Sequence, residues 1–278
     1  MRCSAKYISI NGLRLHYIES GDENARPMIL LHGTGDNAHI WDGLISSISK
    51  HFRTIALDQR GHGCSDWAIP PAYGCDDYVS DILEFVDDLQ LEGIVLIGHS
   101  MGALHATRFA SIKPQKVAGL IHVDIEPSPP LWNKKYLLNL YHTLPDYYAS
   151  TEDFVRQLQQ TSPFAEKDLL LQLANHALHE GVDGWLRPRF DKEVLRHFDQ
   201  YDLSHDLVRI TCPALIIRGE ESRVMRRKEA RQMNRMMLKS RLEEIPHATH
   251  PVHTDNPHAF QQAVFKFLED AGLIDHAA

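Results

Sequence analysis

The stretch Gly93-Ile94-Val95-Leu96-Ile97-Gly98-His99-Ser100-Met101-Gly102 decides the fold of this chain. Its four apolar, mostly β-branched residues from Ile94 to Ile97 predict a short buried strand, and the apolar spacing after Gly102 predicts a helix. Gly-x-Ser-x-Gly between a strand and a helix is typical of a nucleophile elbow, a sharp turn that presents the serine hydroxyl. The serine backbone is strained there, and small residues two positions to either side let the chain pass. Ser100 is therefore the candidate nucleophile.

Size and composition are typical of a globular chain with one large α/β core. With 278 residues, 43% hydrophobic and 24% charged, one domain with an insertion fits better than two equal domains. The formal net charge of −8 argues against nucleic acid or an anionic membrane as a partner. The N-terminus lacks the apolar core of a signal peptide, and the cysteines lack paired spacing. We therefore expect a cytoplasmic setting with reduced thiols.

Expected strands and helices alternate along the first part of the chain. Residues 6–20 alternate apolar and polar around Asn11-Gly12, which predicts a β-hairpin with a type I′ turn. The apolar run Met28–Leu31 predicts a strand buried on both faces of a parallel sheet. We therefore expect an α/β fold with helices on both faces and a site at the carboxyl ends of the strands. The other expected elements are helices 39–50, 78–91, 225–238 and 256–270 and strands 53–57, 117–124, 213–219 and 241–245.

The alternation breaks between Pro127 and about His205. No clean strand is evident there, and helical patterns are separated by proline, glycine and aromatic residues. We expect a helical cap, or lid, over residues 127–205, inserted into a core made of residues 1–126 and 206–278. The helices expected within the cap span 134–143, 151–160, 166–179 and 191–198.

A serine nucleophile requires two backbone N–H donors that stabilise the oxyanion formed during attack. The N–H of Met101, directly after the serine, is the first expected donor. Glycines in His32-Gly33-Thr34-Gly35, after an early strand, let the backbone approach a substrate. We expect the N–H of Thr34 to be the second donor.

The serine also requires a base, and the base requires an acid that orients it. The base is expected in the loop after the last strand, which contains His247, His250 and His253. Three histidines are also a possible set of zinc ligands. Their spacing of three, with an intervening proline, does not hold them on one helical face. We therefore expect no metal and no cofactor, and choose His250 as base, with His253 second.

Taken together, these landmarks resemble the α/β-hydrolase fold, and the chain looks like a small, capped, esterase-like serine hydrolase of that family. The resemblance implies a mostly parallel eight-stranded sheet, with the cap inserted after strand six and His250 aligned with the family base. His247 stands where a glycine is common. The matching segments, which span nearly the whole chain outside the cap, are His32-Gly33, Asp58-x-Arg60-Gly61-His62-Gly63-x-Ser65, Gly98-His99-Ser100-Met101-Gly102, strand 213–219 and His250-x-x-x-x-Asp255-x-Pro257.

The acid departs from the pattern of similar family members. Most carry Asp three residues after the strand-seven glycine, where this chain has Ser222. The resemblance offers a second site at the end of strand six, which Asp124 occupies, and the order Ser100, Asp124, His250 keeps nucleophile, acid and base in the family order. We expect Asp124 to be the acid, with Glu220 or Glu221 as the alternative.

The cap is expected to select the substrate. Its aromatic residues either line a pocket over Ser100 or form the core of the cap itself. We name His32 and His99, which flank the site, with Trp132, Tyr136 and Trp185 of the cap as pocket candidates. Arg187, Arg189 and Arg218 are open to a role in binding a substrate carboxylate or in surface ion pairs.

These observations predict a hydrolase that forms an acyl-enzyme on Ser100 from a small or medium carboxylic ester, thioester or lactone. The resemblance leaves other readings open: a C–C bond or amide hydrolase with the same triad, a cofactor-independent dioxygenase, or a ligand receptor without an enzymatic main role. Epoxide hydrolases and haloalkane dehalogenases need an aspartate nucleophile, and Ser100 argues against both. We expect a small-molecule substrate and a monomer or homodimer.

Overall fold

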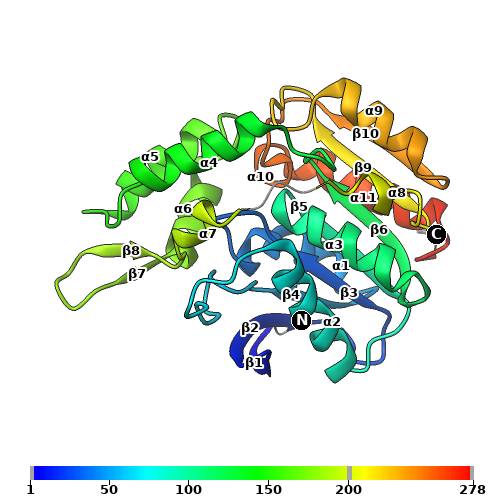
Figure 1. The fold of residues 1–278 in the computed structure, drawn as a ribbon, viewed down its shortest axis with the longest axis horizontal. Helices are drawn as coiled ribbons and strands as arrows, with labels where there is room; N and C mark the ends of the chain where they lie inside the picture. Colours follow the sequence, from blue (N-terminus) through cyan, green and yellow to red (C-terminus); the bar gives the residue numbers. More distant parts are fainter. Residues whose placement is uncertain (1–2, 199–201, 276–278) are drawn as a thin grey trace.

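The structure, a computed structural model, describes residues 3–198 and 202–275. Its centre is an eight-stranded sheet whose second strand runs antiparallel to both neighbours, while the remaining pairs are parallel. This arrangement confirms the expected mostly parallel sheet. In chain order, its strands are β1 (Ser4–Ile10), β2 (Leu13–Ser20), β3 (Pro27–Leu31), β4 (Arg53–Leu57), β5 (Ile94–His99), β6 (Val117–Val123), β9 (Ala214–Gly219) and β10 (Ser240–Ile245). In space, the order is β1-β2-β4-β3-β5-β6-β9-β10 (Figure 1).

The hairpin β1–β2 has the expected turn. Asn11 and Gly12 both have positive φ, 49° and 77°, and Ile10 pairs with Leu13 across the two-residue loop. Positive φ at both central positions defines a type I′ turn, which matches the twist of the flanking strands.

Helices cover both faces of the sheet, and β5 shows why its sequence is wholly apolar. Ile94 and Leu96 pack into the hydrophobic cluster under α2, α3 and α9. Val95 and Ile97 pack into the cluster under α1 and α11 on the other face. A strand buried on both faces cannot alternate between apolar and polar residues. These helices are α1 (Asp42–Ile48), α2 (Cys75–Asp88), α3 (Met101–Ile112), α9 (Arg227–Met236) and α11 (Pro257–Asp270), and two short helices flank them, η1 (Ala38–Trp41) and α10 (Val252–Asp255).

The register of three central strands sets the position of the site. His99 pairs with Val123 across β5 and β6, and Val123 pairs with Ile217 across β6 and β9. Ser100 and Asp124, one residue further along, therefore leave adjacent strands at the same edge of the sheet. Carboxyl ends of parallel strands are where α/β sheets place their ligands.

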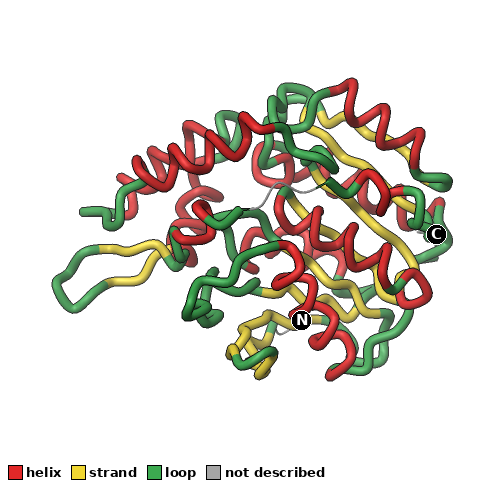
Figure 2. Tube along the Cα trace, in the orientation of Figure 1, coloured by secondary structure: helices red, strands yellow, loops and turns green. Residues whose placement is uncertain are grey.

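The segment between β6 and β9 lies over this edge, and most of its regular structure is helical (Figure 2). Part of it packs on the core, where Leu137, Val194 and Leu195 share a cluster with Met101 and Leu104. It also has a small core of its own, in a cluster built on Phe154, Leu170 and Leu178 among others. The cap boundaries at 127 and 205 stay a prediction. Its elements are α4 (Leu131–Thr143), α5 (Thr151–Thr161), α6 (Lys167–Ala177), β7 (Leu178–Glu180), β8 (Leu186–Pro188), α7 (Glu193–Arg196) and α8 (Ser204–Leu207).

Two expectations about local structure were wrong. The cap contains a hairpin, β7–β8, where no strand was expected, because strands of three residues are too short to show an alternating pattern. The helix expected at 39–50 is split, with a 3₁₀ turn before α1. Within the described residues, no helix is both long enough and apolar enough to cross a membrane.

Candidate active site

Ser100 lies in the turn between β5 and α3 with the strained backbone that its motif predicts. Its φ of 52° and ψ of −124° are rarely adopted by a non-glycine residue. The backbone N–H of Ser100 donates to Val123 O at 2.9 Å, which anchors the turn to β6. A Cβ on Gly98 would lie 2.3 Å from Gly102 O, and one on Gly102 would lie 2.4 Å from Leu31 O. Both glycines are therefore required for the chain to pass.

His250 links the serine to an acid. Its Nε2 lies 3.0 Å from Ser100 Oγ, and its Nδ1 lies 2.8 Å from Asp124 Oδ2. Because the carboxylate accepts a hydrogen bond from Nδ1, Nε2 is left to accept the serine proton. His247, three residues earlier, has a φ of 51°, which explains why similar chains favour glycine there.

Asp124 is completely buried and held by three donors. It has a φ of 53°, a conformation that aspartate tolerates better than most residues. Its Oδ1 accepts from Gly219 N at 2.9 Å, and its Oδ2 accepts from Ser222 Oγ at 2.5 Å in addition to His250. Ser222 therefore donates a hydrogen bond to the carboxylate of Asp124, and it does not occupy the position of that carboxylate.

The two alternative acids, Glu220 and Glu221, contact groups other than His250. Glu221 Oε2 accepts the backbone N–H of Ala248 at 2.9 Å. Glu220 faces Arg227 at 3.7 Å, with half of its side chain exposed. Of the three carboxylates considered, the structure brings Asp124 to His250.

The loop after β3 is fixed by His32. Gln59 N donates to its Nε2 at 3.0 Å, so Nδ1 carries the hydrogen and donates to Gly33 O at 2.7 Å. Burial lowers the pKa of His32, which favours this neutral form. In a trans peptide the C=O and N–H point in opposite directions, so this contact turns the N–H of Thr34 away from His32.

His32 is completely buried, so it does not line a pocket; both of its ring nitrogens make hydrogen bonds with backbone atoms. Met101 is the first residue of α3, and the first N–H groups of a helix have no partner within it. Thr34 and Met101 remain predicted oxyanion donors.

His99, a pocket candidate from the sequence, connects two loops of the site through a partner that no local pattern indicates. Its Nε2 donates to the backbone carbonyl of His250 at 3.0 Å. Its Nδ1 faces Asp36 Oδ2 at 3.7 Å, too long for a hydrogen bond, and would lie 2.8 Å from a Cβ on Gly33. Burial lowers the pKa of His99, and the Asp36 carboxylate partly opposes this.

His253, the second candidate base, lies behind the site. It is 8% exposed, stacks on Trp41 with 4.9 Å between ring centroids, and meets His99 edge-on. Burial lowers its pKa well below the ordinary value. These contacts place it among packed rings instead of beside Ser100.

The three aromatic pocket candidates of the cap lie in two different places. Trp132 and Tyr136 are one turn apart on α4 and are 42% and 47% exposed, so they share a helix face and remain pocket candidates. Trp185 lies in the turn of the β7–β8 hairpin and packs on Tyr147. This hairpin projects away from the sheet (Figure 1). We therefore leave Trp185 out of the proposed pocket.

The three arginines have partners in the structure. Arg187 pairs with Asp183, and Arg218 pairs with Glu244 at 2.7 Å. Arg189 donates to the backbone carbonyl of Leu178.

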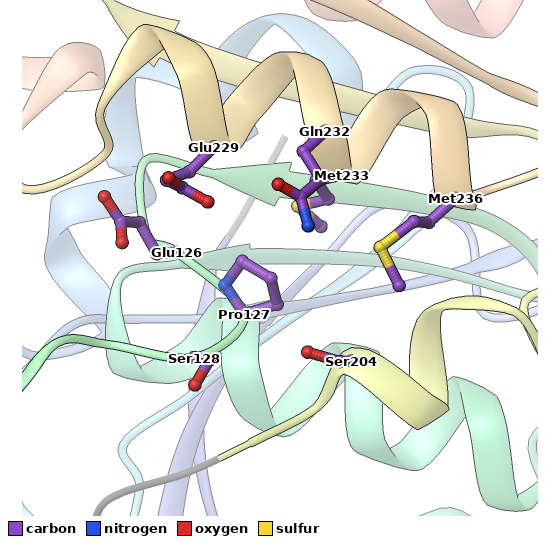
Figure 3. A pocket seen from close by; sticks show the side chains of 8 residues that line it. All are labelled: Glu126, Pro127, Ser128, Ser204, Glu229, Gln232, Met233 and Met236. Carbon is purple, nitrogen blue, oxygen red and sulfur yellow. The ribbon is translucent and has the colours of Figure 1, made fainter.

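Other groups of polar side chains lie outside the triad. Among the described residues, two sets have potential metal-ligating atoms within 4.8 Å of one another: His16, Asp58 and Cys64, and His39, Asp42 and His176. A pocket of about 150 Å³ lies against α9, lined by Glu126, Ser204 and Met236 among others (Figure 3). Glu126 is already paired there with Arg226 at 2.7 Å.

Comparison with known proteins agrees with this fold. A model of the alpha/beta hydrolase fold family matches residues 26–257. The 2-(acetamidomethylene)succinate hydrolase of Mesorhizobium japonicum is 26% identical over 272 residues, covering 95% of each chain. Epoxide hydrolase 4 of Mus musculus is 27% identical over 288 residues, covering 95% of this chain and 78% of its own.

Among solved structures, a crystal structure of E-2-(acetamidomethylene)succinate hydrolase superimposes with a TM-score of 0.87 at 25% identity, covering 96% of this chain and 100% of its own. The mostly parallel eight-stranded sheet agrees with the family match. The chain belongs to the alpha/beta hydrolase fold family and is a hydrolase.

Proposed function

We propose that this protein is a serine hydrolase that cleaves a small or medium carboxylic ester, thioester or lactone through an acyl-enzyme on Ser100. The observation that carries the proposal is the unbroken chain of hydrogen bonds from Ser100 Oγ through His250 to the buried Asp124. This arrangement has the geometry of a serine nucleophile, its base and an orienting acid.

In the proposed reaction, His250 Nε2 takes the proton of Ser100 as Oγ attacks the substrate carbonyl. The N–H groups of Met101 and Thr34 stabilise the tetrahedral oxyanion. His250 returns the proton to the leaving group and then takes one from water, which releases the acid and regenerates the serine. Asp124 holds the imidazole in the required tautomer and stabilises its charged form.

The surroundings of the serine bear on the acyl part of the proposed substrate. Ser100 is 8% exposed and lies beneath a segment rich in aromatic residues. Such surroundings suit an apolar acyl group of modest size. We include Trp132 and Tyr136 in the proposed pocket, and residues 127–205 as the cap that covers it.

An amide is the second candidate substrate. The relative from Mesorhizobium japonicum is named for a compound with an acetamido group, and it covers nearly all of this chain. The similarity to an epoxide hydrolase does not extend the proposal to epoxides, since we expect those enzymes to use an aspartate where this chain has Ser100.

Hydrolysis of a series of p-nitrophenyl esters, beside the matching N-acyl enamines, tests the proposal. We expect turnover of short acyl chains that is lost in Ser100→Ala and retained in Ser46→Ala, a matched change of an exposed serine in α1. Turnover of both substrate sets at similar rates would favour the amide candidate. Retained ester hydrolysis in Ser100→Ala would contradict the proposal.

A further inference from the structure

Three potential metal ligands meet where the cap lies against the core. His39 and Asp42 come from η1 and the start of α1, and His176 comes from the last turn of cap helix α6. One ligating atom of each lies within 4.8 Å of the other two. None of the three belongs to the proposed catalytic machinery.

Two of the three side chains already contact each other. His39 Nδ1 and Asp42 Oδ2 are 2.9 Å apart, the distance of a hydrogen bond, and an ion bound by both atoms would replace that bond. The rings of His39 and His176 are stacked, with centroids 3.5 Å apart and planes 15° apart. Because the lone pairs of an imidazole lie in the plane of its ring, the two rings turn out of this stack to bind a common ion.

The three side chains also border a cavity of about 110 Å³ between α1, α6 and α11. Its wall includes His253, which is 8% exposed and whose buried Nδ1 has no hydrogen-bond partner among the described residues. A buried, unpartnered nitrogen beside the cluster is a second sign that this space is suited to a polar ligand, because buried polar atoms are normally paired.

We propose that His39, Asp42 and His176 bind one divalent transition-metal ion of the zinc class, which ties cap helix α6 to the core. Two imidazoles and a carboxylate are a ligand set that such ions accept, with water in the fourth position. Rotation of the side chains closes the site, since the Asp42 side chain is 51% exposed. Bound metal therefore stabilises the contact between cap and core.

Titration of the full chain, without a histidine tag, with Zn²⁺ by calorimetry and with Co²⁺ by visible absorption tests this inference. We expect one ion per chain and the absorption bands of four-coordinate Co²⁺. His176→Gln and Asp42→Asn are expected to weaken binding at least about tenfold. His258→Gln, which removes an exposed histidine outside the cavity, is the matched control and is expected to leave binding unchanged.

Hydrogen exchange gives a readout that is independent of hydrolysis. Zn²⁺ is expected to slow exchange in α6 of the unchanged protein and of Ser100→Ala, but not of His176→Gln. Equal binding by the unchanged protein and His176→Gln, or an equal loss in His258→Gln, would overturn the proposed site. If ester hydrolysis is absent while Zn²⁺ binds as expected, the proposed function fails and the metal site stands.

Discussion

Ser222 donates its hydroxyl hydrogen to Asp124 Oδ2 at 2.5 Å, on the same oxygen that faces His250 Nδ1. The direction of this bond is fixed because Ser222 Oγ itself accepts from the backbone N–H groups of Val224 and Met225. Strand β9 thus contributes a donor to an acid that comes from β6. Similar chains carry the catalytic carboxylate after the seventh strand of the sheet, which is β9 here. At that position this chain carries Ser222, which donates a hydrogen bond to the carboxylate of Asp124.

Ser222→Ala is expected to lower kcat roughly tenfold and the free energy of unfolding by about 1.5–3 kcal/mol, the range for a hydrogen bond to a charged group. KM should change little, because Ser222 acts through Asp124. Steady-state kinetics and urea unfolding measure the two effects. Ser46→Ala, whose hydroxyl bonds within its own helix, should change neither, and an unaltered kcat in Ser222→Ala would disprove a supporting role.

Asp124→Asn is expected to lower kcat by about 10⁴-fold, because an amide at this position favours the wrong tautomer of His250. Glu220→Gln and Glu221→Gln should stay near the original kcat, since their side chains contact other groups. Steady-state kinetics on the best ester measures all three. A large loss of kcat in Glu220→Gln or Glu221→Gln, with Asp124→Asn near the original kcat, would place the acid in the loop after β9.

His99 is expected to position the base through its Nε2–H bond to the His250 carbonyl. Glutamine places an amide nitrogen near the position of Nε2, whereas asparagine is shorter and mimics Nδ1. His99→Gln should therefore keep most of kcat, and His99→Asn should lose about 10- to 100-fold, as expected for a base displaced by about 1 Å. Similar losses in both variants, with KM raised, would indicate substrate contact instead of positioning.

The buried histidines are expected to make the fold sensitive to acid. His122 is completely buried between Thr107 and Ile125 O, and burial lowers its pKa from 6.5 to about 4. Between these values the unfolded chain binds a proton that the folded chain does not, so stability falls as pH falls. The full effect is roughly 3 kcal/mol for this group.

Urea unfolding between pH 7 and pH 4 measures this slope. His122→Gln should flatten it, and His258→Gln, at an exposed position, should not. Equal slopes in the unchanged protein and His122→Gln would show that His122 is not the source.

Local patterns were enough to predict the centre of the fold. The apolar run of β5 leads directly into the Gly-x-Ser-x-Gly pattern, so strand, turn and helix follow from adjacent residues, although Gly102 also leaves room for Leu31 O of a distant strand. Because position 222 is a serine, the sequence favours Asp124 as the acid, with Glu220 or Glu221 as the alternative. The strand register places Asp124 at the same edge as Ser100, where it contacts His250.

Contacts between distant segments were not predictable in the same way. His32 is a pocket candidate from the sequence, but its ring nitrogens bond to Gly33 and Gln59, and no local pattern reveals such partners. The stacking of His39 on His176 depends on how the cap lies against the core. Trp185 was considered by residue type alone, which does not reveal that its hairpin projects away from the sheet.

The most direct test of the account is covalent capture of the nucleophile. Incubation with a fluorophosphonate, followed by intact-mass and peptide mass spectrometry, is expected to show one adduct per chain, on Ser100. The adduct should be absent in Ser100→Ala and form much more slowly in His250→Gln. An adduct on another residue, or undiminished labelling of Ser100→Ala, would contradict the assignment of Ser100 as the nucleophile.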